Sequence, residues 1–87
     1  PWDEMSSFMR GAAEAPSLIR AALFSEASNP FSESGISVTR EAIHDAGDIA
    51  ATNGEAMLAR IEVGITSLLE QDFQPISLGG DHAITFP

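Results

Sequence analysis

With 87 residues, the chain can bury one small hydrophobic core at most. It contains no cysteine, so disulfides and thiolate metal sites are excluded. Acidic residues outnumber basic ones by 13 to 4, and the formal charge of -9 argues against nucleic acid and anionic membranes as partners. No stretch approaches the roughly 20 apolar residues that a membrane span requires, so we expect a soluble protein.

The first part of the chain combines a loop, a helix and a connector. Residues 1–15 mix Pro, Asp, Ser and Gly without helical or alternating periodicity, which predicts a long surface loop. A short helix is predicted from about Pro16 to Phe24, because Pro suits the first helical position and apolar residues follow at helical spacing. Residues 25–35 are rich in turn-forming residues and are predicted to be a connector.

The middle of the chain contains the clearest predicted element. A short strand is predicted near His44 to Ile49, although Gly47 weakens it. Thr52 and Glu55 have the spacing of a capping box, which marks the start of a helix. That helix is predicted at about Asn53 to Gln71, because its apolar residues recur at intervals of three and four on one face: Met57, Leu58, Ile61, Ile65, Leu68 and Leu69.

The run PISLGG, which begins at Pro75, has the apolar character of a buried parallel strand. The resulting order of strand, helix and strand predicts a βαβ unit and hence an α/β protein with a parallel sheet. Two short strands cannot cover both faces of such a sheet. We therefore expect the missing partners to lie outside this segment or in another chain.

The sequence Gly79-Gly80-Asp81-His82 follows this predicted strand. Open α/β sheets bind ligands at the carboxyl ends of their strands, and glycines let the backbone pass close to a metal or substrate. His82 supplies an imidazole that suits Mn, Fe, Ni or Zn, and Asp81 can orient neighbouring ligands. Judged from these residues alone, a packed or hydrogen-bonded histidine is the simpler alternative, since one imidazole cannot hold a catalytic metal.

Three segments together resemble a known family. PISLGGDHAITFP resembles the first metal-ligand motif of the ureohydrolases, the family of arginases and agmatinases, and His82 matches its first metal-ligating histidine. PWDEMSSFMRGAAEAPSLIRAAL resembles the first loop and helix of that family, and HDAGDIA resembles its DxGD segment. The resemblance implies a three-layer αβα arginase-like fold with a central parallel sheet. Residues 1–87 would then form a partial domain without its first strand and its carboxyl-terminal metal-binding half.

The resemblance also implies a function. The implied function is that of an agmatinase- or arginase-type hydrolase. Such an enzyme cleaves a guanidino C–N bond, releases urea and uses a binuclear Mn centre. The remaining ligands of the family come from D-x-H-x-D and D-x-D motifs, neither of which occurs before Pro87, so we expect this segment alone to be inactive. The implied partners are a small cationic guanidino substrate, agmatine or arginine, and further copies in a homo-oligomer, a trimer or hexamer. The implied location is cytoplasmic.

The competing hypothesis is a noncatalytic α/β module that assembles or regulates other proteins and lacks a complete metal site. The truncation of the segment before the other metal-ligand motifs motivates this alternative. The chain begins on Pro1 without an initiator Met and stops just after an apolar run, so we expect both ends to be cut.

Other polar and aromatic residues are interpreted as structural. His44, Asp45 and Asp48 are interpreted as turn and strand-end residues rather than as a second metal cluster. Several polar residues lie on the loop expected at the rim of the active site, where substrate or subunit contact is the alternative to a solvated loop: Asp3, Glu4, Ser6, Ser7 and Arg10. Four aromatic residues are predicted to pack: Trp2, Phe8, Phe24 and Phe31.

Overall fold

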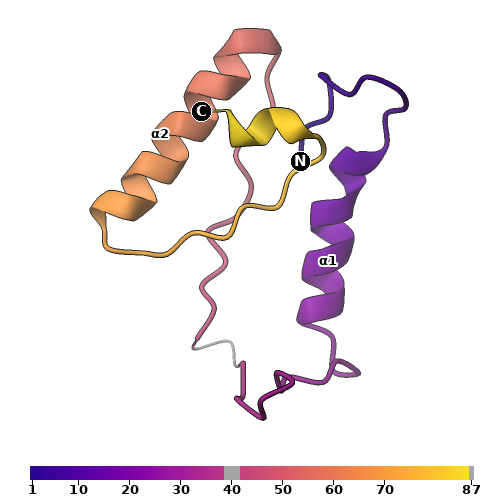
Figure 1. The fold of residues 1–87 in the computed structure, drawn as a ribbon, viewed down its shortest axis with the longest axis vertical. Coiled ribbons are helices and arrows are strands. Elements are labelled where there is room, and N and C mark those ends of the chain that lie inside the picture. Colours follow the sequence, from indigo (N-terminus) through magenta and orange to yellow (C-terminus); the bar gives the residue numbers. More distant parts are fainter. Residues whose placement is uncertain (39–41, 87) are drawn as a thin grey trace.

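Helices provide the regular secondary structure of the computed structural model, which describes residues 1–38 and 42–86. Two are α-helices, α1 (Ala15–Leu23) and α2 (Gly54–Glu70), and two are short 3-10 helices, η1 (Ala12–Glu14) and η2 (His82–Thr85). Figure 1 shows α1 and α2 standing apart at the two sides of the molecule. The start of the last element, η2, returns to the N-terminal segment, where the N–H of Met5 donates a hydrogen bond to Asp81.

Both predicted helices are confirmed to within about a residue at each end. Pro16 lies in the first turn of α1, where its missing N–H costs no hydrogen bond, and its side chain is buried. The helix stops at Phe24, whose N–H donates to the carbonyl of Arg20. On the apolar face of α2, Met57 and Ile61 are buried, whereas Leu69 at its carboxyl end is exposed.

The predicted capping box is wrong. The N-cap of α2 is Asn53, and its side chain makes no capping hydrogen bond with the first turn in the described structure. A capping box requires Thr at the N-cap and Glu three residues later. Because the helix begins one residue after the expected position, Glu55 occupies the second helical position. Its carboxylate still lies in the first turn, where negative charge interacts favourably with the helix dipole.

Neither predicted strand is formed in the described residues. Residues 44–49 and 75–79 carry no strand assignment, and the only β-pairing of the described part is an isolated antiparallel bridge between Phe31 and Ser37. This bridge closes a turn through Gly35, whose φ of 76° favours glycine, and it confirms the connector. A parallel strand needs a neighbouring strand for its ladder of hydrogen bonds. The described residues present none to either segment, so the sheet stays a prediction.

The core is small and joins three distant parts of the chain. Trp2, Met57 and Ile61 form the buried hydrophobic cluster of the described part, and five partly buried residues pack around them: Ile49, Leu58, Ile65, Ala83 and Ile84. The radius of gyration is 14.5 Å, above the value of about 12 Å expected for a compact domain of this length. Much apolar surface on both helices is therefore uncovered, including Leu18 and Val63.

The four aromatic residues that were predicted to pack behave differently from one another. Trp2 is buried and Phe24 is half-buried, so the prediction is confirmed for the first and partly met by the second. It is wrong for Phe8 and Phe31, which are 91% and 57% exposed. Both of these lie on loops that no described helix covers. An aromatic side chain on such a loop has nothing to pack against.

Candidate metal site

The Gly79-Gly80-Asp81-His82 turn brings its backbone close to two neighbours. A Cβ at Gly79 would overlap the side chain of Ile84, and a Cβ at Gly80 would overlap the carbonyl group of Trp2. Any larger residue must therefore displace the core residue Ile84 or the N-terminal segment. Both glycines are required by close approach to other parts of this chain. The predicted approach to a metal or substrate stays a prediction.

Asp81 sets the position of the helical turn that carries His82. It is the N-cap of η2, and its Oδ1 accepts a hydrogen bond from the N–H of Ala83 at 2.8 Å. Its other oxygen, Oδ2, accepts from the N–H of Met5 at 3.0 Å. Both oxygens of this carboxylate are thus used by backbone donors. His82 follows as the first residue of a capped turn.

His82 is exposed, and no hydrogen bond or ion pair engages its imidazole within the described residues. Its carbonyl accepts from the hydroxyl of Thr85 at 2.8 Å, which closes the turn. The packed-histidine alternative therefore does not describe this side chain. An exposed imidazole on a fixed turn fits one ligand position of a transition-metal site.

One imidazole is not a metal site. Within residues 1–38 and 42–86, no group of three or more His, Asp, Glu or Cys side chains is arranged to hold a metal ion. The carboxylate nearest in sequence, Asp81, is already engaged by two N–H donors. The described residues therefore offer one free imidazole at this turn and no complete ligand set for a metal.

The loop of residues 3–11 lies against the turn that precedes His82. Asp3 is buried, and its Oδ2 accepts hydrogen bonds from the N–H groups of Gly11 at 2.6 Å and Ala13 at 3.2 Å. These donors, Gly11 first, hold the pKa of Asp3 below its ordinary value because they stabilise the ionised form. Within the loop, the Ser6 hydroxyl donates to the carbonyl of Met9. Asp3 is therefore a structural residue.

Three other polar residues of this loop differ from Asp3 in their exposure and contacts. Glu4, Ser7 and Arg10 are exposed, and no hydrogen bond or ion pair ties their side chains to the described residues. The loop lies beside the turn that precedes His82. Its expected position at the rim of an active site stays a prediction. Whether these side chains touch a substrate or a subunit stays a prediction.

His44, Asp45 and Asp48 make structural contacts. The predicted turn bonding is confirmed at Asp45, whose Oδ1 accepts from the N–H of Gly47 at 2.9 Å, whereas the predicted strand-end bonding is wrong because residues 44–49 form no strand. The guanidinium of Arg20 on α1 pairs with Asp45 at 2.7 Å and with Asp48 at 2.8 Å. The hydrogen bond from Arg20 holds the pKa of Asp48 below its ordinary value and raises that of Arg20. The ring of His44 stacks on Phe73 with centroids 6.0 Å apart. Arg20 is the residue that sequence reasoning missed, since its only signal is a lone charge on a largely apolar helix.

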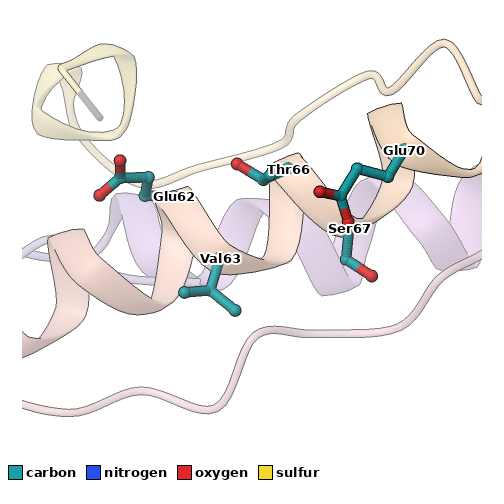
Figure 2. Close-up of a pocket in the computed structure, with 5 residues that line it drawn as sticks. All are labelled: Glu62, Val63, Thr66, Ser67 and Glu70. Carbon is teal, nitrogen blue, oxygen red and sulfur yellow. The ribbon is translucent and has the colours of Figure 1, made fainter.

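A surface hollow on α2 offers no second site. It is lined by five residues of that helix, and Figure 2 shows their side chains lying along the helix rather than converging on one point: Glu62, Val63, Thr66, Ser67 and Glu70. No imidazole contributes to this hollow, and all five residues are exposed.

No helix of the described part combines the length and apolar character of a membrane span.

Comparison with known proteins places these features in a family. A formimidoylglutamase of Halalkalibacterium halodurans is 40% identical over 92 residues. The mitochondrial arginases 1 of Oryza sativa subsp. indica and Arabidopsis thaliana are each 28% identical over 96 residues. Every one of these alignments covers the whole chain but only 28% of the relative. No solved structure matches the chain significantly.

The turn of His82 and the loop packed on it both lie within the region that these relatives share. The sequence profile of the Arginase family matches residues 1–87, which is the complete chain. The match therefore includes the glycine turn, the Asp81 cap and the exposed imidazole. On this basis, the chain belongs to the arginase family.

Proposed function

We propose that this chain is the amino-terminal part of a metal-dependent hydrolase that cleaves the C–N bond of a linear amidine group. The observation that carries the proposal is the exposed, unengaged imidazole of His82 on a turn capped by Asp81. This turn lies in a chain that matches the arginase family over its whole length. Family membership also implies an arginase-like α/β fold, and the uncovered apolar faces of α1 and α2 are surfaces that a sheet would cover.

The proposed metal centre is a binuclear manganese site to which His82 contributes one nitrogen ligand. Its other ligands would lie in the remainder of the protein, since the described residues contain no further ligand group. Two divalent cations supply Lewis-acid activation of water near neutral pH. The part played by this chain is to hold the imidazole. Asp81 fixes the turn, and Gly79 and Gly80 allow the turn to pack tightly against Ile84 and Trp2.

The proposed substrate carries a guanidino or formimidoyl group on a primary amine. Hydrolysis of the C–N bond of a guanidino group, the group that arginine carries, releases urea and the amine. Hydrolysis of the same bond of a formimidoyl group, the group that the name formimidoylglutamase contains, releases formamide and the amine. Agmatine, arginine and formimidoylglutamate are the substrates to assay, and the released product identifies the class.

The test compares two histidines of the full-length protein. His82→Ala should abolish turnover and lower the manganese content, because it deletes a proposed ligand. His44→Ala is the matched control, since His44 is also exposed but stacks on Phe73 away from the glycine turn. Manganese content by elemental analysis and product release would both be measured. A His82→Ala protein with wild-type manganese content and turnover would overturn the proposal.

The noncatalytic alternative makes a different prediction for the wild-type protein. A purely structural module would bind no stoichiometric manganese and would hydrolyse none of the three substrates. The same preparation also tests the proposed trimer or hexamer by light scattering. Fractionation of the source cells tests the proposed cytoplasmic location. The alternative location is the mitochondrion, which the names of two arginase relatives contain.

A further inference from the structure

The loop of residues 3–11 is joined to the glycine turn at two adjacent points. The backbone of Gly80 lies so close to Trp2 and Asp3 that a Cβ there would overlap the Trp2 carbonyl. One residue later, Asp81 accepts the hydrogen bond from Met5, across 76 positions of sequence. Figure 1 shows the same arrangement, with the N-terminal segment running beside η2. The loop and the proposed metal-ligand turn therefore form one unit.

A single carboxylate connects the two parts of this unit. Oδ1 of Asp81 caps η2 through Ala83, and Oδ2 holds Met5. The two bonds use different oxygens, so a side chain with one acceptor atom can keep one of them but not both. The position of His82 and the position of the loop thus depend on the same residue.

The loop is also held at its far end, which leaves a defined exposed tip. Asp3 binds the N–H groups of Gly11 and Ala13, and this closes the loop on itself. Between the two attachments, Phe8 and Met9 are 91% and 69% exposed. A loop that is fixed at both ends and exposed in the middle keeps its tip in a defined position.

We propose that Asp81 is a positioning residue that holds the loop of residues 3–11 against the turn of His82, so that the loop flanks the approach of the substrate. The part of this inference that concerns the substrate rests on the proposed function. The part that concerns the loop rests on the contacts of Asp81 and Gly80 alone.

Substitutions at position 81 separate the two roles in the full-length protein. Asp81→Ser keeps a good N-cap for η2 and loses the acceptor for Met5, because the short side chain carries one oxygen. Asp81→Ala loses both bonds. Gly80→Ala keeps the carboxylate and pushes the N-terminal segment away from the turn. Glu26→Ser is the matched control, since it removes an exposed acid that makes no hydrogen bond or ion pair in the described structure.

The first measurement is tryptic cleavage of the native protein after Arg10, which lies within the loop. Loss of a hydrogen bond to a charged group should raise the rate of this cleavage about tenfold in Asp81→Ser. Cleavage after Arg20 and Arg60 provides the internal reference, because global unfolding would raise all three rates. Glu26→Ser should be cleaved like the wild type. An unchanged rate after Arg10 in Asp81→Ser would overturn the inference.

The second measurement is the separation of KM from kcat together with manganese content. Asp81→Ser should retain its manganese and raise KM more than it lowers kcat, because the loop is displaced while the turn of His82 is kept. Asp81→Ala should in addition lose manganese. If the loop is cleaved faster in Asp81→Ser but KM and kcat are unchanged, the loop takes no part in substrate approach and the positioning role is refuted.

The outcomes for this inference and for the proposed function are distinguishable. If the wild-type protein hydrolyses none of the substrates, the proposed function fails, while the cleavage rates after Arg10 still decide whether Asp81 holds the loop. If Asp81→Ser does not fold by circular dichroism, Gly80→Ala decides the same question. Faster cleavage after Arg10 in that variant, with the reference cleavages unchanged, supports the inference, and a wild-type rate overturns it.

Discussion

The burial of Met57 leads to a sharp prediction about stability. Met57 lies on α2 at the centre of the small core, with 2% of its surface exposed, and it packs in one cluster with Trp2 and Ile61. Met57→Ala therefore removes a side chain that is almost completely sequestered from water. The same substitution leaves the helix itself intact, because Ala and Met both have high helix propensity.

The expected cost follows from burial and from the surroundings of the side chain. Truncating a buried Met to Ala costs about 2 to 5 kcal/mol, and the value depends on how far the neighbours collapse into the space. Here the neighbours Leu58, Ile65 and Ile84 are only partly buried, so they are free to move. We therefore expect a loss near the lower end of that range, about 2 kcal/mol.

Urea unfolding of the full-length protein measures this loss as a shift of the midpoint at constant slope. Val63→Ala on the same helix is the control, because Val63 is 69% exposed and its truncation should change the stability by less than about 0.5 kcal/mol. The reasoning is refuted if the two variants lose the same free energy of unfolding. It is also refuted if Met57→Ala loses less than about 1 kcal/mol.

Two further predictions concern the charged residues that hold loops in place. The pKa of Asp3 is depressed, so the ionised carboxylate adds stability that is complete above its ordinary pKa of 3.8 and is lost as the pH falls through the lower folded value. The difference in unfolding free energy between wild type and Asp3→Asn should therefore be constant near neutral pH and shrink as the pH falls below 3.8; a difference that grows in acid would contradict this. Arg20→Gln should remove the ion pairs with Asp45 and Asp48 and speed amide hydrogen exchange at Gly47, with Arg10→Gln as the control. Equal exchange in the two variants would show that Arg20 does not hold this segment.

The helices were predictable because their signals are local. The spacing of apolar residues in α2 and the position of Pro16 in α1 depend only on neighbours within a turn or two. Both elements accordingly occur where they were expected. The capping box failed by one residue, since Asn53 competes with Thr52 for the N-cap and side-chain caps differ by only about 1 kcal/mol.

The strands were not predictable in the same way. The apolar run that begins at Pro75 has the composition of a buried strand, but composition does not supply a partner. A strand is stabilised by its neighbours in the sheet, and the described residues provide none to this run. Membership of the arginase family implies a sheet that the fold of these residues does not itself display.

The candidate site was predictable in its motif and not in its surroundings. His82 and the two glycines were identified from a short run of sequence, and the structure exposes the imidazole on a capped turn. The second bond of Asp81 was not identified, because Met5 is 76 positions away. The hydrogen bond from Arg20 to Asp48 was missed for the same reason, because the two residues are 28 positions apart.

The sequence by itself therefore determined the two α-helices, the turn-rich connector and the residue types of the GGDH turn, all of which depend on interactions between near neighbours. Only the tertiary structure decided that the first residues of the chain pack against the last. The burial of Trp2, the contact of Gly80 with its carbonyl and the bond from Met5 to Asp81 all follow from that packing. Contacts of this kind arise from the balance of burial and chain entropy over the whole molecule, and no local pattern of residues specifies them.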